Sequence, residues 1–257
     1  MSSEVDTVGF RVTMKSMSDI DNSPNPIDSP QTLPNWVLPW PSFEVDWNHA
    51  GLLIIDYQNY SSDPESGFAR MLVDKFPEVA AYYIPRLTQV TIPNTRRLLD
   101  AFRKCERQVV FTRHGPLLPD GRDMIARRRK RDADSAETTE RPTLWAKGSY
   151  EHEVIAELAP LEHELVLDKN AASAFNSSAI DQMLRNLRIE SLVITGMATD
   201  MCVETTARDA ADRGFNVIVV EDAVATFDPE HHRHALSSLA RVFGQVWSTD
   251  QVLEACR

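Results

Sequence analysis

Short apolar runs alternate with segments of helical periodicity from Gly51 to the C-terminus, and this alternation restricts the fold more than any other feature. The first run ends in Asp56 after residues that are apolar at every position, as expected for a parallel strand buried on both faces. This run and the later ones predict strands at 51–56, 108–113, 165–168, 191–195, 215–220 and 245–248.

The segments between these runs predict helices at 79–104, 178–187, 201–213 and 231–242. Pro85 and Pro93 are expected to break or kink the first helix, and Asp228 to cap the last one. Strand–helix units of this length predict an α/β fold: a doubly wound, six-stranded parallel sheet flanked by helices.

The N-terminal residues differ in composition and predict an arm over 1–47, followed by a folded domain over 48–257. Prolines recur between positions 24 and 41 among Ser, Asp and Asn, which favours extended backbone. The segment 33–40 adds Trp36 and Trp40 among aliphatic residues. That much apolar surface favours packing on this subunit or on a neighbouring one.

Charge and cysteine usage exclude several classes of protein. The net charge of −11 argues against non-specific nucleic-acid binding, which needs a basic surface. There is no apolar run long enough for a membrane span and no visible signal peptide. Cys105, Cys202 and Cys256 are widely spaced and fit neither a disulfide framework nor a zinc site, so a cytoplasmic location is expected.

Polar residues stand where three of the predicted strands end, and parallel sheets bind ligands at that edge. These are Asp56, the pair Asp168-Lys169, and the turn 196–202, after which a helix is expected to begin at Cys202. A helix N-terminus and a nearby cation such as Lys169 both lower the pKa of a thiol and favour the nucleophilic thiolate. Asp56 would then serve as general base and acid, and the amides of the turn would bind an oxyanion.

Each of these residues also has a plain structural interpretation. A cysteine near a helix start is more often a small buried hydrophobe, and a strand that ends in Asp often ends in a turn or cap. Lys169 after Asp168 would also suit a surface ion pair of little energetic value. Position alone therefore gives only a weak prediction of a site.

Five blocks, taken in order, resemble the isochorismatase-like cysteine hydrolase superfamily over about residue 51 to the C-terminus. They are Ile54-Ile55-Asp56-Tyr57-Gln58-Asn59, Asp168-Lys169, Thr195-Gly196-Met197-Ala198-Thr199-Asp200-Met201-Cys202-Val203, Thr205-Thr206-Ala207-Arg208-Asp209-Ala210 and Glu221-Asp222-Ala223.

The resemblance implies a catalytic triad of Asp56, Lys169 and Cys202 on a Rossmann-like three-layer fold. It also implies a cis peptide before Ala198, with the amides of Ala198 and Cys202 forming an oxyanion hole. The implied reaction is cleavage of a C–N bond in a small amide, ureido or carbamoyl compound through an acyl-thioenzyme. No cofactor is expected, and the resemblance together with the apolar arm suggests a homo-oligomer, either a dimer or a tetramer.

The stretch 111–116 lacks the Asp-x-His pair that binds metal in nicotinamidases of this superfamily, so we expect neither a metal nor nicotinamide as substrate. Segments 147–150, 154–158 and 173–176 resemble the ureidoacrylate and biuret hydrolase branch, to which carbamoylsarcosine amidase is close. The candidate substrate contacts are Gln58, His114, Tyr150, Phe175 and Asn176. Arg113 and Arg122 join Tyr150 as weaker candidates for holding a substrate carboxylate. Asn176 or Ser177 would equally well cap the next helix.

Three alternatives remain open at this stage. The first is vinyl-ether hydrolysis of the isochorismatase type, although the presence of Cys202 favours acyl chemistry. The second is a nicotinamidase-like carboxamide hydrolase, and the third is a non-enzymatic binding module. The basic run 127–131 is expected to be a solvated helix face, or alternatively a gate over the site.

Overall fold

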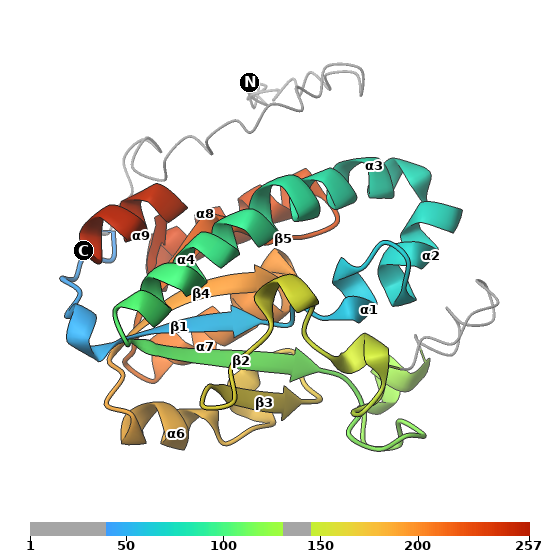
Figure 1. The fold of residues 1–257 in the computed structure, drawn as a ribbon, viewed down its shortest axis with the longest axis horizontal. Helices are drawn as coiled ribbons and strands as arrows, with labels where there is room; N and C mark the ends of the chain where they lie inside the picture. Colours follow the sequence, from blue (N-terminus) through green and yellow to red (C-terminus); the bar gives the residue numbers. More distant parts are fainter. Residues whose placement is uncertain (1–39, 131–144) are drawn as a thin grey trace, which may run out of the picture.

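The fold is a single parallel sheet with helices on both faces, in a computed structural model that describes residues 40–130 and 145–257 (Figure 1). The six strands lie in the order β3-β2-β1-β4-β5-β6, and every neighbouring pair is parallel. They are β1 (Ala50–Ile55), β2 (Gln108–His114), β3 (Leu165–Lys169), β4 (Ser191–Met197), β5 (Asn216–Ala225) and β6 (Gln245–Trp247). The predicted fold class is confirmed. The strand order reverses between β1 and β4, the position where such sheets bind ligands.

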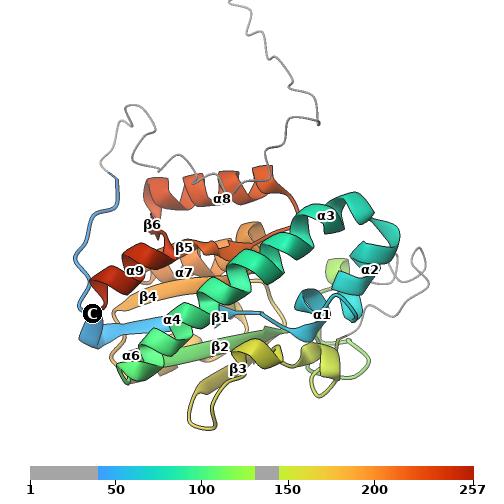
Figure 2. The same ribbon diagram turned by 45° about the horizontal axis from the view of Figure 1, so that its top comes forward.

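Alternating side chains of the central strands point into two separate hydrophobic cores, one on each face of the sheet. Leu52 and Ile54 of β1 point into one cluster, whereas Leu53 and Ile55 point into the other. Helices α3 (Pro77–Pro85), α4 (Ile92–Lys104) and α9 (Thr249–Ala255) cover the first face. Helices α6 (Ile180–Asn186), α7 (Glu204–Asp212) and α8 (Pro229–Val242) cover the second. The turned view in Figure 2 shows the α3–α4 run crossing the sheet with α7 behind it.

Pro85 and Pro93 do not break the predicted first helix. The backbone stays helical from Pro77 to Lys104, but it widens into the π-helical segment η4 (Arg86–Thr91) between α3 and α4. The amide of Ile92 donates to the carbonyl of Leu87, five residues back, just before Pro93. The wider turn makes room for the proline ring, which clashes with a carbonyl in a regular α-helix.

Two short helices were not predicted: α1 (Asn59–Ser62) and α2 (Gly67–Lys75), which follow β1. The predicted cap of α8 is confirmed, because the Asp228 side chain accepts hydrogen bonds from the first amides of that helix. None of the helices in the described part of the chain has the length and apolar character that a membrane crossing requires.

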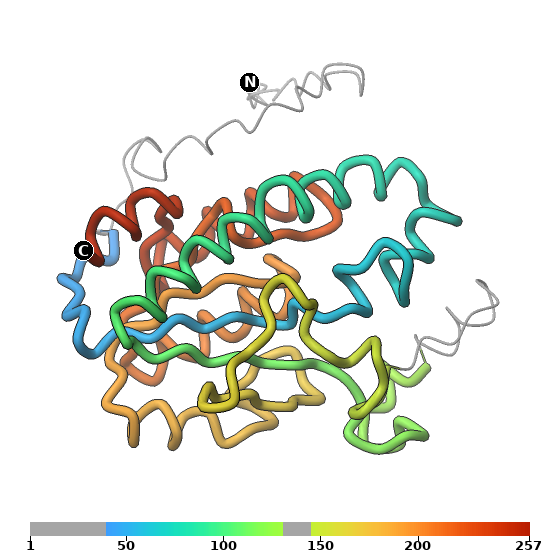
Figure 3. The backbone as a smooth tube through the Cα atoms, viewed as in Figure 1, coloured from blue at the N-terminus to red at the C-terminus, as the bar shows by residue number. Residues whose placement is uncertain are grey.

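The beginning of the described chain packs beside its C-terminal end (Figure 3). Phe43, Val45 and Trp47 pack against the first core cluster, and the rings of Trp47 and Trp247 lie 6.5 Å apart. The last residues of the predicted arm therefore lie on the domain. Residues 1–39, with most of the apolar segment 33–40, lie outside the described residues.

Candidate active site

Asp56, Lys169 and Cys202 come from three different parts of the chain and meet at one edge of the sheet. Asp56 follows β1, Lys169 is the last residue of β3, and Cys202 lies in the π-helical segment η8 (Thr199–Val203) that follows β4. Nζ of Lys169 lies 2.7 Å from Oδ2 of Asp56. The Asp56 carboxylate and the Lys169 ammonium group both act electrostatically on the thiol of Cys202. The structure thus brings together all three residues of the predicted triad.

The carboxylate of Asp56 is buried and held through both of its oxygens. Oδ2 faces Lys169, and Oδ1 accepts a hydrogen bond from Oγ1 of Thr112 at 2.7 Å. Asp56 also has a φ of 54°, a conformation that residues other than glycine rarely adopt. Thr112 was missed by the sequence reasoning, although a hydroxyl inside the apolar run 108–113 was a signal that could have revealed it.

Lys169 is fully buried and remains charged. Its ammonium group donates to the carbonyls of Ala171 and Ala172 at 3.1 and 3.0 Å, in addition to facing Asp56. Burial by itself lowers the pKa of this amine, but its interactions with the Asp56 carboxylate and with Cys202 outweigh burial and raise the pKa above its usual value. The buried cation therefore has the partners that it requires.

The expectation that Cys202 has a lowered pKa is wrong. Burial raises the pKa of the thiol to about 12; Lys169 acts in the opposite direction, and the Asp56 carboxylate adds to the increase. Cys202 also lies inside the π turn before α7 rather than at the first residue of an α-helix. The resting site therefore holds a protonated thiol beside a carboxylate and an ammonium group.

The loop 196–202 places backbone amides beside the thiol. The peptide bond between Met197 and Ala198 is cis, which confirms that expectation. The amides of Met201 and Val203 both donate to the carbonyl of Ala198, at 3.0 and 3.2 Å. The amide of Cys202 lies between them and takes no part in that pair of hydrogen bonds.

Gln58 and His114 are the two substrate-contact candidates that lie near the triad. The side chain of Gln58 joins β1 to β2: its Nε2 donates to the carbonyls of His114 and His152, and its Oε1 accepts from the amide of His114. Its amide group is thus committed to the backbone. His114 is different, because its Nδ1 is buried and has no hydrogen-bond partner among the described residues. Burial, assisted by the charge of Lys169, holds the pKa of His114 well below its usual value, so the imidazole is neutral.

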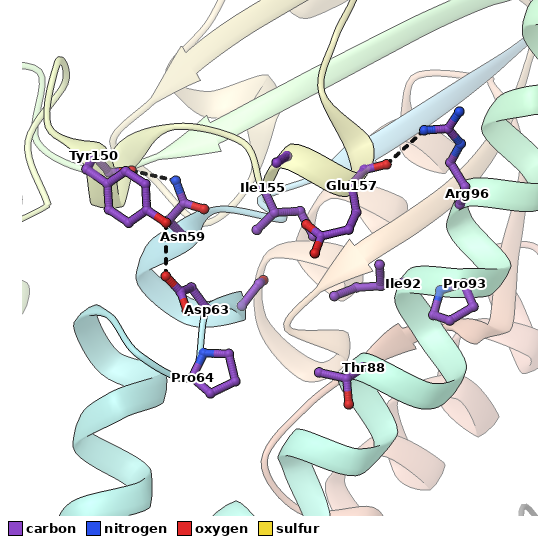
Figure 4. Close-up of a pocket in the computed structure, with 12 residues that line it drawn as sticks. Asn59, Asp63, Pro64, Thr88, Ile92, Pro93, Arg96, Tyr150, Ile155 and Glu157 are labelled. Atoms are coloured by element: carbon purple, nitrogen blue, oxygen red, sulfur yellow. Dashed lines mark hydrogen bonds between the residues drawn. The ribbon is translucent and has the colours of Figure 1, made fainter.

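The other three candidates do not contact the triad. The Tyr150 hydroxyl donates to Asp63 on an exposed surface (Figure 4). The ring of Phe175 packs against Phe215 and Arg213. Asn176 is exposed. Neither Asn176 nor Ser177 caps the next helix, because the Ser178 hydroxyl accepts from its first amide instead.

The two arginine candidates are held by other carboxylates. Arg113 pairs with Asp168 and Glu153, and the exposed Arg122 pairs with Asp120. In the basic run, Arg127 and Arg129 are exposed, whereas the guanidinium of Arg128 lies 4.9 Å from the ring of Trp145. Residue 131 lies outside the described residues.

A groove of about 510 Å³ lies beside the site but does not contain the triad (Figure 4). It runs between α1, α4 and the segment 150–157. Its polar lining is largely paired within the protein, as in the hydrogen bond from Arg96 to the carbonyl of Glu157. The triad residues are absent from its walls, so we do not assign the reaction to this groove.

Aromatic residues that follow β1, β2 and β5 gather at the catalytic edge of the sheet, and the sequence did not reveal them. Tyr60 stacks on Trp145 with ring centroids 3.9 Å apart, and Phe68 lies against both Tyr60 and Phe227. Nε1 of Trp145 donates to the carbonyl of His114, which links this aromatic group to the site.

A metal-binding cluster of three or more His, Cys, Asp or Glu side chains does not occur in the described ranges. The last three residues of β2 carry a hydroxyl bound to Asp56, a guanidinium bound to Asp168 and the neutral imidazole of His114. This set of groups does not suit a divalent cation.

This chain is similar to known proteins in both sequence and structure. Residues 50–251 match the protein-family model described as Isochorismatase domain. Nicotinamidase 3 of Arabidopsis thaliana is 27% identical over 201 residues, which cover 76% of this chain and 92% of that protein. Ureidoacrylate amidohydrolase RutB of Stutzerimonas stutzeri is 30% identical over 215 residues, which cover 79% of this chain and 81% of that protein.

Two solved structures illustrate the structural similarity. N-carbamoylsarcosine amidase from Thermoplasma acidophilum superposes with a TM-score of 0.55 and 28% identity, covering 78% of this chain and 96% of that one. A cysteine hydrolase from Pseudomonas syringae pv. phaseolicola superposes with a TM-score of 0.69 and 24% identity, covering 86% of this chain and 98% of that one. The second similarity supports the fold alone.

Proposed function

This chain belongs to the isochorismatase family of hydrolases, and from that premise we propose that it cleaves a C–N bond of a small amide or ureido compound through an acyl-thioenzyme on Cys202. The observation that carries the proposal is the buried ion pair of Asp56 and Lys169 together with the electrostatic action of both groups on the Cys202 thiol. A nucleophile beside a base, with the base held by a third group, is the arrangement that covalent catalysis requires.

In the first half-reaction, the sulfur of Cys202 attacks the carbonyl carbon of the substrate. Because the pKa of the resting thiol is about 12, its proton passes to Asp56 as the S–C bond forms. The carbonyl π electrons move onto oxygen, and the amides of Ala198 and Cys202 donate to that oxyanion. Asp56 then delivers the proton to the departing nitrogen, the C–N bond breaks, and ammonia or an amine leaves.

In the second half-reaction, water hydrolyses the thioester. Asp56 takes a proton from the water as its oxygen attacks, and the thiol of Cys202 recovers a proton when the S–C bond breaks. Lys169 holds Asp56 in an ion pair and opposes the negative charge that develops on sulfur and oxygen. His114 would hydrogen-bond a polar group of the substrate through its unpartnered Nδ1.

The substrate class favoured by the relatives is a ureido or carbamoyl compound. The names of two relatives refer to a ureidoacrylate and to a carbamoylsarcosine. A nicotinamidase-type carboxamide hydrolase is the second candidate, because Nicotinamidase 3 matches most of this chain. The side chains at the end of β2 favour the first class over a metal-assisted nicotinamidase.

The test is an ammonia-release screen over ureido acids, biuret and nicotinamide, with wild type, Cys202→Ala and Cys105→Ala compared. Cys105 is an exposed free cysteine at the end of α4 and serves as the matched control. We expect Cys202→Ala to abolish turnover and Cys105→Ala to retain it. Mass spectrometry of the acid-quenched wild type should detect the acyl group on Cys202. Ammonia release by Cys202→Ala near the wild-type level would overturn the thioester route.

The division into an arm over 1–47 and an isochorismatase-like domain over 48–257 stays a prediction. The homo-oligomeric state, dimer or tetramer, and the cytoplasmic location also stay predictions. Sedimentation of the full chain, beside a variant that begins at residue 40, would measure the contribution of the arm to assembly.

A further inference from the structure

A buried histidine of α8 joins the two π-helical segments of the described chain. Arg86 is the first residue of η4 and Thr199 is the first residue of η8. His232 lies between them: its Nε2 is 2.9 Å from Nη2 of Arg86, and its Nδ1 is 2.9 Å from Oγ1 of Thr199. Both His232 and Thr199 are buried, so these contacts are shielded from competing water.

The chemistry of the three groups sets the direction of both hydrogen bonds. A guanidinium has only donors, so Nε2 of His232 must accept from Arg86. Burial, assisted by the charge of Arg86, keeps the pKa of His232 well below its usual value, so the imidazole carries a single proton. That proton is on Nδ1, which donates to the hydroxyl oxygen of Thr199.

Arg86 is itself fixed to the sheet. The same nitrogen that faces His232 donates to the carbonyls of Glu221 and Val224, at 2.9 and 3.1 Å. These residues lie in the part of β5 where the register against β4 shifts, between the pairs Ile194–Val219 and Gly196–Val224. Arg86 therefore uses backbone carbonyls at the irregular part of β5 as its anchor.

Thr199 directly follows Ala198, whose amide is one of the two proposed oxyanion donors. The next residue is also anchored, because the Thr226 hydroxyl donates to the carboxylate of Asp200. From the other side, the Tyr83 and Ser62 hydroxyls contact the sulfur of Met197 at 3.4 and 3.3 Å. The orientation of the loop thus depends on side chains that lie behind it.

We propose that Thr199, His232 and Arg86 form a positioning relay that holds the amides of Ala198 and Cys202 in the orientation needed by the oxyanion. The inference rests on the proposed function, because it assigns a purpose to these residues in that same reaction. None of the three contacts the substrate in this scheme. Their effect passes through the backbone of the loop, so it should appear in kcat more than in KM.

Variants of Thr199 and His232 test the relay. Thr199→Val keeps the shape of the side chain and removes the hydroxyl, Thr199→Ser keeps the hydroxyl, and His232→Phe removes both ring nitrogens. Since loss of one oxyanion donor lowers kcat by about 10²–10³-fold, misalignment of the pair by Thr199→Val or His232→Phe should lower it by about tenfold or more, with KM within about threefold. Thr199→Ser should keep most of kcat. His234→Gln, an exposed histidine on the same helix, should match wild type.

A second measurement reports on the relay without any turnover. The ¹⁵N chemical shifts of His232 should show a protonated Nδ1 and an unprotonated Nε2. Thr199→Val should shift the Nδ1 resonance. Wild-type kcat in Thr199→Val, in an enzyme that Cys202→Ala inactivates, would overturn the relay while the proposed function stands. A proton on Nε2 would also overturn it. Full turnover by Cys202→Ala would instead overturn the proposed function, and the role of the relay with it.

Discussion

The two sides of the candidate site are built on different principles. On the side of β1 and β3, the groups that we propose to act are the charged side chains Asp56 and Lys169, buried and 2.7 Å apart. On the side of β4, they are the backbone amides of Ala198 and Cys202, which we propose are oriented by side chains behind the loop. Breaking a buried ion pair leaves one charge without a partner, so removing either charged side chain should cause a large loss of both stability and turnover. Single substitutions behind the backbone amides should each cause a smaller loss of turnover.

The largest expected effect is that of Lys169→Met, compared with Lys147→Met. Each lysine lies 2.7 Å from an aspartate, Lys169 from Asp56 and Lys147 from Asp168, but Lys169 is buried and Lys147 is 55% exposed. Lys169→Met should reduce the free energy of unfolding by about 3–5 kcal/mol and kcat by about 10⁴-fold. Lys147→Met should change stability by about 0–1 kcal/mol. Urea unfolding measures the stability of the two variants, and ammonia release measures their kcat. Equal losses of stability in Lys169→Met and Lys147→Met would contradict the difference expected between a buried and an exposed ion pair.

Asp56→Asn separates the effect of the carboxylate on the pKa of the Cys202 thiol from its effect on the turnover rate. The carboxylate raises the pKa of Cys202, so its removal should bring that pKa below about 12. Turnover should nevertheless fall by about 10²–10⁴-fold, because the variant has no proton acceptor. The rate of alkylation by iodoacetamide as a function of pH measures the thiol pKa. Lys169→Met should shift it in the opposite direction, and an unchanged pKa in both variants would contradict the assigned contacts.

Gly196→Ala tests how closely the two sides approach each other. A Cβ at this position would lie 2.1 Å from the carbonyl oxygen of Ile55, the residue that directly precedes Asp56 in the sequence. The φ of Gly196 is 130°, which a residue with a side chain rarely adopts. The variant should lose about 2–4 kcal/mol of stability from crowding and strain together. Gly214→Ala is the matched control, since its φ is 87° but nothing lies within 4 Å of the added carbon. That control should lose only about 1–2 kcal/mol in urea unfolding.

The smallest expected effect is on the pH dependence of stability, to which each side of the site contributes one histidine with a lowered pKa. His114 and His232 both have pKa values well below 6.5, so above that pH they are neutral in the folded and unfolded chains alike. Below pH 6.5 the unfolded chain binds protons that the folded one does not, so stability falls by up to about 1.4 kcal/mol per pH unit for each histidine. Urea unfolding between pH 7.5 and 5.5 should show a shallower slope for His232→Phe, and His234→Gln should keep the slope of wild type.

The strands and the triad could be predicted because both depend on local pattern. A buried parallel strand is apolar throughout and is followed by a polar residue, and this held for β1 and Asp56. The edge strand β3 is partly exposed, and its apolar run is followed by Asp168 and Lys169. The strand ends of a parallel sheet meet at one edge, so residues distant in sequence were predicted to come together. The cis bond before Ala198 followed from the resemblance alone.

The rest depends on three-dimensional neighbours that have no fixed spacing in the chain. Arg86, His232 and Thr199 belong to three separate elements, and none of the three stands out in sequence. The pKa of Cys202 was predicted in the wrong direction because the degree of burial, the largest cause, cannot be read from a motif. Phe175 follows the triad lysine closely in sequence, yet its ring turns toward Phe215.

A cysteine that keeps its proton until a carbonyl arrives has little reactivity toward anything else. Peroxide oxidises the thiolate rather than the thiol, so Cys202 should form sulfenic acid slowly although the residue is partly exposed. Enzymes that store a ready thiolate depend on reductants to restore it after oxidation. Here the proton itself protects the sulfur, and in the proposed reaction Asp56 takes that proton only as the sulfur attacks a substrate carbonyl.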